Sequence, residues 1–257
     1  MRVASIAVSL VFLFSQSSTQ SIPSPVARDP QAVALLQSSL RAMGGSPPAD
    51  SVAIGTVTIV AGSQTSTGTI RILTHGTNQS SEQITLPQST HSVTYSAGLA
   101  DETINSATTS LPLERAVTSQ SVCFPFPFLA AALANADASI QFIAQETLGQ
   151  QSLQHIRIQN TFASQPNLQQ FAELATFDIW IDANTSLPQR ISFVRRDASG
   201  AAPRIPVDAF FAAYQTTSGF AYPSQIKISF NGTPWTIITI NSVTFNTGLT
   251  DSMFSVQ

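Results

Sequence analysis

The sequence has 257 residues, of which 43% are hydrophobic and only 10% are charged, and its formal net charge is -3 at pH 7. An average soluble domain has about 25% charged residues, so Ser, Thr, Asn and Gln must form much of the solvated surface here. No cluster of Lys or Arg could neutralise several phosphates, which argues against nucleic acid as a partner.

The N-terminal residues have the pattern of an export signal. Arg2 supplies a positive charge, residues 3–14 are apolar, and small polar residues follow as far as Ser21. This pattern is typical of a signal peptide and is too short for a membrane-spanning helix. We therefore expect residues 1–21 to be removed and the protein to be exported, to the periplasm or the extracellular space. No cysteine lies near this segment to carry a lipid anchor, and an integral membrane protein is not expected.

A helix is predicted over residues 29–43. Asp29 has the position of an N-cap, Pro30 that of the first helical residue, and Gly44 follows the end. Apolar residues recur at helical spacing, namely Val33, Leu36, Leu40 and Met43. The helix is therefore amphipathic and must pack on an apolar surface.

The remaining chain is dominated by strand patterns with alternating side chains. Strands are expected over residues 51–62, 66–76, 91–98, 177–182, 189–194, 205–215, 223–230 and 235–245. The Asn231-Gly232 pair between the last two is typical of a tight hairpin turn. No repeat or linker divides the chain, so residues 22–257 are expected to form a single, mostly antiparallel domain.

The segment CFPFPFLAAALANA, which starts at Cys123, places phenylalanines and prolines before an uncharged alanine-rich stretch. Because proline is excluded from helix interiors and central strands, we predict an extended approach and a helix that begins near Phe128. The candidates for lining an apolar cavity are Phe124, Phe126, Phe128, Leu129 and Leu133. Ordinary core packing is the alternative, since burying a phenylalanine is worth about 2 kcal/mol in either setting.

No combination of side chains indicates catalysis or a bound cofactor. Cys123 is the only cysteine, so it has no internal disulfide partner and is expected to be an inert apolar residue. His75, His91 and His155 lack the spacing of zinc ligands, and neither a G-x-S-x-G motif nor a phosphate-binding glycine loop is present. We therefore expect a protein that is not an enzyme and needs no metal or cofactor.

The acidic residues also fail to form an acid/base pair. Asp101 and Glu102 are neighbours in a strand pattern and should face opposite sides. Asp178 and Asp182 share a face but are separated by Trp180, and that face is expected to be solvated. Asn-x-Ser/Thr sequences occur at Asn78, Asn184 and Asn231 in expected turns, where glycans would attach only in a host that glycosylates exported proteins.

The order of these motifs resembles that of a known family. The relevant segments are DPQAVALLQSSLRAMGG, GTIRILTHG, FPFPFLAAALA, DIWIDANTSLPQRISF, a G-x-x-x-P at Gly219–Pro223, and an N-x-x-L-x-D-x-x-F ending at Asn246–Phe254. Together they span most of residues 29–254. The chain resembles the outer-membrane lipoprotein carrier superfamily, the LolA/LolB-like half-barrels, and in particular their uncharacterised periplasmic relatives.

The resemblance implies an α+β fold in which a curved antiparallel half-barrel sheet wraps around a few helices and encloses an apolar cavity. It implies a non-enzymatic binder of a lipid, an acyl chain or a similar amphiphile. The other hypothesis is a structural or interaction module of the cell envelope or surface that binds a protein or a glycan. The two hypotheses differ in whether a cavity exists beneath the helices.

Overall fold

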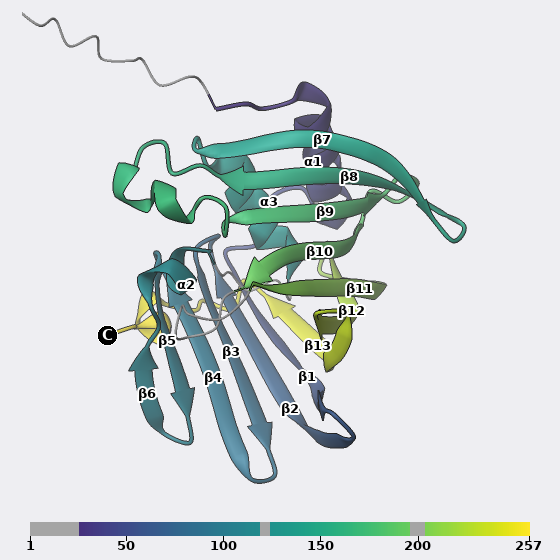
Figure 1. Ribbon diagram of the computed structural model, residues 1–257. Helices are drawn as coiled ribbons and strands as arrows, with labels where there is room; N and C mark the ends of the chain where they lie inside the picture. Colours follow the sequence, from purple (N-terminus) through teal and green to yellow (C-terminus); the bar gives the residue numbers. More distant parts are fainter. Residues whose placement is uncertain (1–25, 119–123, 196–203) are drawn as a thin grey trace, which may run out of the picture.

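The computed structural model describes residues 26–118, 124–195 and 204–257, and Figure 1 shows them as one strongly curved sheet with helices against its inner face. The expected signal segment, residues 1–21, and Cys123 lie outside the described residues. The sheet has thirteen strands in the order β6-β5-β4-β3-β2-β1-β13-β12-β11-β10-β9-β8-β7. Every neighbouring pair in this order is antiparallel.

The strands are β1 (Asp50–Ala61), β2 (Gln64–His75), β3 (Gln79–Leu86), β4 (Ser89–Ser96), β5 (Leu99–Ile104), β6 (Ala107–Ser110), β7 (Ala138–Leu148), β8 (Gln151–Asn160), β9 (Thr176–Asp182), β10 (Pro188–Arg195), β11 (Ile205–Thr217), β12 (Phe220–Phe230) and β13 (Thr233–Phe245). The helices are α1 (Pro30–Met43), α2 (Leu113–Thr118) and α3 (Pro125–Ala134), with 3-10 turns η1 (Pro166–Phe171) and η2 (Asp251–Phe254).

The sheet consists of two lobes, which we define as β1–β6 and β7–β13. Each lobe is an up-and-down meander, and the lobes join where β1 pairs with β13, with Ser51 opposite Phe245. Strands β6 and β7 are therefore the two outer edges of the sheet, although they are consecutive in sequence. The connection between them must pass from one edge to the other, and it carries α2 and α3 across the inner face.

The main hydrophobic core lies between the inner face of the sheet and helices α1 and α3. Helix α1 buries Leu36 and Met43 as predicted, together with Ala32 and Ser39, while Val33 and Leu40 are only partly buried. Its Asp29 side chain accepts a hydrogen bond from the N–H of Gln31 at 2.7 Å, as expected of an N-cap. Strand residues of both lobes complete the core, including Ile72, Ile156, Ile179, Ile191, Phe211 and Ile240.

The prediction for the start of α3 was wrong. The helix begins at Pro125 rather than near Phe128, and Phe124, which directly precedes it, has an extended backbone. Both prolines fall in the first turn, where the backbone N–H groups have no partner within the helix, so their missing donors cost nothing. Phe126 and Phe128 therefore point in different directions, because they lie two positions apart in a helix.

The predicted strands are confirmed in type and pairing, but the sheet is larger than expected. The prediction missed β3, β5, β6, β7 and β8, whose sequences are rich in Ser, Thr, Gln and Glu.

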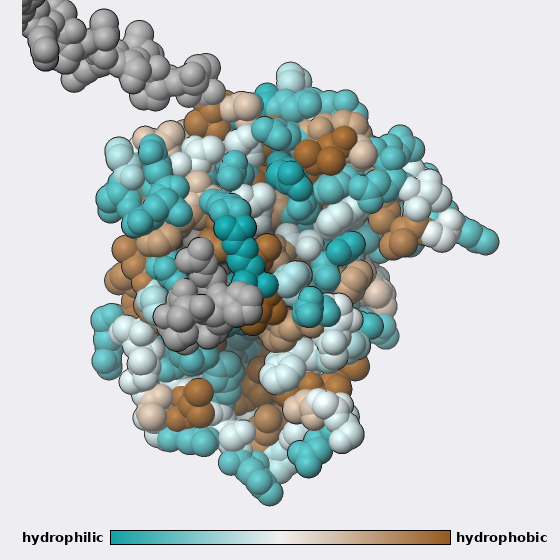
Figure 2. All heavy atoms as spheres, viewed as in Figure 1, coloured by the Kyte–Doolittle hydropathy of each residue, from teal (hydrophilic) through white to brown (hydrophobic). Residues whose placement is uncertain are grey.

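The three Asn-x-Ser/Thr sequences begin in turns, as predicted. In the view of Figure 2, apolar atoms occur in several separate groups among polar ones and form no single continuous patch.

Segments at both ends of the described chain are held against the sheet. Near the N-terminal end, the N–H of Asp29 donates to the Ile140 carbonyl at 2.8 Å, so this segment lies along the edge of β7. The Arg28 guanidinium donates to the carbonyls of Leu133 and Asn135, each at 2.9 Å, which satisfies the last turn of α3. At the other end, Phe254 is fully buried and stacks on the His75 ring.

Candidate ligand-binding site

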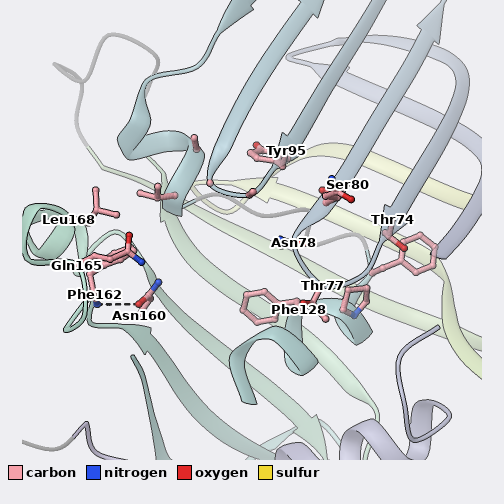
Figure 3. Close-up of a pocket in the computed structure, with 17 residues that line it drawn as sticks. Thr74, Thr77, Asn78, Ser80, Tyr95, Phe128, Asn160, Phe162, Gln165 and Leu168 are labelled. Carbon is pink, nitrogen blue, oxygen red and sulfur yellow. Dashed lines mark hydrogen bonds between the residues drawn. The ribbon is translucent and has the colours of Figure 1, made fainter. Parts of the chain in front are cut away.

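A cavity of about 390 Å³ lies where the two lobes, α2 and α3 meet. Ligand sites of small molecules typically have volumes of about 300–1,000 Å³. The cavity is lined by Thr74, Thr77, Asn78, Gln79, Ser80, Tyr95, Ala97, Gly98, Ala116, Val117, Phe124, Pro127, Phe128, Asn160, Phe162, Gln165 and Leu168. Figure 3 shows Ser80 and Tyr95 on one side of this space, Phe128 on a second, and Asn160 to Leu168 on a third.

The lining divides into polar and apolar parts that come from different elements. Hydroxyl and amide groups come from the β2–β3 turn and the connection after β8, for example Asn78 and Gln165. Aromatic and aliphatic groups come from α2, α3 and η1, for example Phe128 and Leu168. None of the seventeen lining residues is Asp, Glu, Lys, Arg or His. The cavity can therefore accommodate apolar groups and form neutral hydrogen bonds.

A second cavity, of about 310 Å³, adjoins the first. It is lined by Thr77, Asn78, Val117, Phe128, Ala131, Ala132, Ala134, Asn135, Ala138, Ile158, Asn160, Ala175 and Phe177. Five residues line both cavities, namely Thr77, Asn78, Val117, Phe128 and Asn160. The alanines of α3 leave space between this helix and strands β8 and β9, and so the alanine-rich composition of the segment has a structural consequence.

Phe128 lies in the wall between the two cavities. Its ring packs edge-on against Phe177 of β9, with 4.9 Å between ring centroids. The side chain is 5% exposed, so it is held firmly although it borders both spaces. A change in its rotamer would alter the shape of both cavities.

The loop after β8 is fixed by hydrogen bonds to Asp137. The Asp137 carboxylate accepts the N–H of Ser164 at 3.0 Å and its hydroxyl at 2.5 Å. The Asp137 carbonyl accepts the Thr161 hydroxyl at 2.8 Å. Between these anchors, Phe162 has a φ of 50°, a conformation that non-glycine residues seldom adopt, and its N–H donates to the Asn160 side chain at 3.1 Å. The loop is thus held so that Phe162 lines the cavity.

The hairpin turns opposite this loop are fixed by polar contacts as well. The hydroxyls of Thr74 and Ser51 lie 2.6 Å apart on neighbouring strands. The Gln79 amide contacts the His75 ring nitrogen at 2.6 Å and donates to the Ser96 hydroxyl at 3.2 Å. These contacts join the β2–β3 turn to β4 and set the position of the polar wall.

The structure places the five predicted site residues in two settings. Phe124 and Phe128 line the first cavity, and Phe128 also lines the second. Phe126 packs on Phe220 with 6.1 Å between ring centroids, Leu129 is fully buried, and Leu133 is partly buried against the core. The last three line neither of these cavities. The sequence analysis did not predict the polar side of the cavity. The segment Gly76-Thr77-Asn78 is recognisable as a turn, but its position opposite α3 depends on the tertiary fold.

The outer face of the second lobe is less solvated than predicted. Trp180 and Asp182 are 9% and 6% exposed. The Asp182 carboxylate accepts the N–H of Thr185 at 2.8 Å in the turn after β9, whereas Asp178 accepts two hydrogen bonds from the Arg157 guanidinium, at 2.9 and 3.1 Å. The two carboxylates have separate partners, so they form no pair.

Trp180 belongs to a ladder of stacked side chains across β8 to β11. His155 stacks on Trp180 with 4.3 Å between ring centroids, and the Arg190 guanidinium lies 4.3 Å from the Trp180 ring centre. The Trp180 indole N–H donates to Glu146 at 2.9 Å, and this hydrogen bond is the main reason why the pKa of Glu146 lies below its usual value. Partial burial opposes the effect, and the His155 ring, 2.7 Å away, adds to it.

The other acidic pair is separated as predicted. Glu102 lies 3.6 Å from the Arg115 guanidinium and 3.0 Å from the His91 ring nitrogen, whereas the Asp101 carboxylate accepts the N–H of Gln257 at 2.7 Å. Within the described part of the chain, no group of three or more His, Cys, Asp or Glu side chains could hold a metal ion. No helix there is sufficiently long and apolar to cross a membrane.

Comparison with known proteins places the fold but leaves the function open. No protein-family model and no curated protein sequence matches this chain. Among solved structures, a domain from Vibrio parahaemolyticus named for outer membrane lipoprotein sorting is similar, with 12% identity and a TM-score of 0.59 over 88% of this chain and 96% of that one.

Two further solved structures share the architecture. A LolA superfamily protein from Nitrosomonas europaea has 13% identity and a TM-score of 0.57 over 88% of this chain and 97% of that one. A DUF1329 family protein from Desulfovibrio piger has 13% identity and a TM-score of 0.55 over 87% of this chain and 97% of that one. The chain thus has the LolA-like fold, and the predicted curved half-barrel of antiparallel strands around a few helices is confirmed.

Proposed function

We propose that the protein binds the apolar part of a lipid, an acyl chain or a similar amphiphile in the two adjoining cavities, without catalysing a reaction on it. The observation that carries this proposal is the pair of cavities of about 390 and 310 Å³, which border on the same Phe128 ring beneath the sheet. Many ligand pockets combine mostly apolar walls with a few polar groups that fix orientation.

The second cavity suits an acyl chain. Its walls include three alanines of α3 together with Ile158 and Phe177, which are buried side chains of the inner sheet face. A hydrocarbon chain transferred there from water gains about 0.8 kcal/mol for each methylene that it buries. Of the five residues predicted to line the cavity, Phe124 and Phe128 are proposed to contact the ligand, with Phe126, Leu129 and Leu133 supporting them from the core.

The test narrows the second cavity and leaves the rest of α3 unchanged. Ala131→Leu places a larger side chain in the cavity wall, whereas Ala130→Leu is the matched control, because Ala130 lines neither cavity. Binding of a pyrene-labelled acyl chain is measured by fluorescence titration for both variants and the parent protein, together with thermal unfolding.

The expected result is an affinity about tenfold weaker for Ala131→Leu, which corresponds to a clash of about 1.4 kcal/mol, and an unchanged affinity for Ala130→Leu. The proposal is wrong if the folded parent protein binds no acyl probe, or if both variants bind it as the parent does. Native mass spectrometry of gently extracted protein gives an independent measurement, since a retained lipid supports the proposal and a bare chain supports an interaction module instead.

We also propose that the protein is exported, with residues 1–21 as the signal. The support is the positive charge of Arg2 followed by the apolar residues 3–14. N-terminal sequencing of the protein from the periplasmic or culture fraction should find a first residue near Ser21. A chain recovered there that begins at Met1 would contradict the proposal.

A further inference from the structure

We propose that the amphiphile held by this protein has an uncharged, hydroxyl-bearing head group, as in a monoacylglycerol or a glycolipid, and that the first cavity holds this head. The inference rests on the proposed function and adds the chemical class of the ligand. Three observations support it: the neutral lining of the described cavity wall, the internal partners of charged groups close to it in sequence, and a lining hydroxyl that forms no hydrogen bond with another described residue.

The first observation is that the described part of the cavity wall carries no charge, since its seventeen residues include no acidic, basic or histidine side chain. A carboxylate or phosphate that leaves water needs a cation or several directed hydrogen-bond donors to compensate its lost hydration. Sites for such anionic groups are usually built around Arg or Lys. The described wall supplies neither Arg nor Lys, and so an anionic head group would bind with lower affinity than an uncharged one.

The second observation is that charged residues close to the cavity in sequence are engaged elsewhere. The Arg28 guanidinium donates to the carbonyls at the end of α3, and the Asp137 carboxylate accepts hydrogen bonds from Ser164. Arg115 precedes the lining residue Ala116, and its charge is paired with Glu102, whose carboxylate lies 3.6 Å from Nη2, although the Arg115 Nε–H is buried without a hydrogen-bond partner among the described residues. None of these groups is free to neutralise a charged ligand without breaking a contact of the fold.

The third observation is the Ser80 hydroxyl. Ser80 is 8% exposed and lines the first cavity, and Figure 3 shows it on the strand side of this space. No hydrogen bond joins this hydroxyl to another described residue, and it is not one of the fully enclosed unpartnered atoms, which are Ser39 Oγ, Asp101 Oδ1 and Arg115 Nε. A hydroxyl both donates and accepts a hydrogen bond, so Ser80 is matched by a second hydroxyl or by an ether oxygen of a ligand.

Amide groups extend this neutral polar wall. The Asn78 and Gln165 side chains reach the cavity from opposite sides (Figure 3). The Asn160 oxygen accepts the Phe162 N–H, and the Asn160 NH₂ group donates to no other described residue. Each amide offers both donors and acceptors. A polyol head with several hydroxyls can form hydrogen bonds with both the donors and the acceptors of these amides. A carboxylate only accepts hydrogen bonds, so it can pair with the amide donors alone.

The experiment compares two ligands that share one chain and differ in head charge. Displacement of the pyrene-labelled acyl probe by 1-monooleoylglycerol and by oleate is measured below their aggregation concentrations at pH 8, in low and in high salt. Ser80→Ala removes the unpartnered hydroxyl. Ser81→Ala is the control, because Ser81 is the next residue in β3, on the opposite face, where its hydroxyl contacts Thr94 at 3.1 Å.

We expect monooleoylglycerol to bind about tenfold more tightly than oleate, with an affinity that does not change with salt. We expect Ser80→Ala to weaken binding of monooleoylglycerol several-fold and binding of oleate little, while Ser81→Ala weakens neither. Equal binding of the two ligands, or tighter binding of oleate, would overturn the inference but leave the proposed function intact, provided that Ala131→Leu weakens both. If neither ligand displaces the probe and the probe itself does not bind, the proposed function fails together with the inference.

Discussion

The carboxylate of Asp50 accepts the backbone N–H of Thr247 at 2.6 Å, although the two residues lie 197 positions apart in the sequence. The same carboxylate also accepts the Thr247 hydroxyl at 2.7 Å and the N–H groups of Gly248 and Leu249 at 2.9 and 3.2 Å. Asp50 begins β1 and is 3% exposed. It therefore ties the segment that follows β13 to the start of the first lobe.

Asp50→Asn is predicted to destabilise the protein by about 2 kcal/mol, because an amide replaces a carboxylate that accepts four hydrogen bonds. Burial by itself raises the pKa of Asp50, but the hydrogen bonds from Thr247, Gly248 and Leu249 outweigh burial and hold the pKa below its ordinary value of 3.8. Denaturant unfolding of the two proteins at pH 7 measures the difference in stability.

The lowered pKa gives the Asp50 effect a definite pH dependence. A carboxyl group whose pKa is lower in the folded state stabilises the fold above its unfolded pKa, and this stability is lost as the pH falls through the folded value. The stability difference between the parent and Asp50→Asn should therefore be full at pH 7 and shrink below about pH 4. Asp251→Asn, an exposed change in the same segment, is the control. A difference that stays constant down to pH 2 would contradict the assignment.

Gly55→Ala is predicted to be severely destabilising, by about 3 kcal/mol. An added Cβ at this position would lie 2.2 Å from the Thr239 carbonyl oxygen of β13, and neither backbone can move without disturbing the β1–β13 pairing. Gly55 also follows an irregularity in that pairing, where Ile54 is opposite Ser242 but Gly55 is opposite Ile240. Thermal unfolding of Gly55→Ala measures this loss. Gly45→Ala, whose added Cβ meets no atom within 4 Å but whose φ of +88° strains an alanine, measures the cost of backbone strain without a clash and should be the milder change.

Phe126→Ala is predicted to cost about 3–5 kcal/mol, as expected for a large core side chain. Phe126 is 4% exposed, packs on Phe220 and lines neither described cavity. Leu113→Ala in α2, where the side chain is 49% exposed, is the matched control and should change stability little. Chemical denaturation measures both, and a Phe126→Ala protein of nearly parental stability would show that this residue is not part of the core.

Trp180→Phe is predicted to raise the pKa of Glu146 toward its ordinary value. Of the groups that lower this pKa, the indole N–H of Trp180 has the largest effect. Phenylalanine also has an aromatic ring but no hydrogen-bond donor. Carbon-detected NMR titration of the Glu146 carboxyl group measures the change. Trp235→Phe alters the other tryptophan, which lies next to Phe230, and should leave the Glu146 titration unchanged; equal titrations in all three proteins would refute the role of the indole.

Local signals in the sequence were sufficient for α1 and for the hairpins of the second lobe. Asp29, Pro30 and Gly44 are strong end signals, and the Asn231-Gly232 turn fixes the β12–β13 hairpin. Strands such as QSSEQITL in β3 were missed because their faces are mostly polar, and alternation is then absent from the sequence. They are strands because neighbouring strands supply their backbone partners, which is a tertiary effect.

The candidate site was predictable only in its apolar half. The phenylalanines of CFPFPF were predicted to line a cavity, and two of them line the first cavity. The wrong start of α3 came from treating proline as a breaker at Pro125 and Pro127, where it instead occupies the first turn. The polar half comes from separate turns and from a loop held by Asp137, and no local pattern indicates that these segments meet.

The pairing of β1 with β13 also constrains how the chain folds. Strand β1 is made early in synthesis, yet one of its two neighbours and the partners of Asp50 occur only at residues 233–249. Contacts between residues so distant in sequence slow folding, because the long loop between them must be closed first. Strand β1 therefore has one unpaired side until β13 reaches it, which is the condition in which a chaperone that binds extended segments would be most effective.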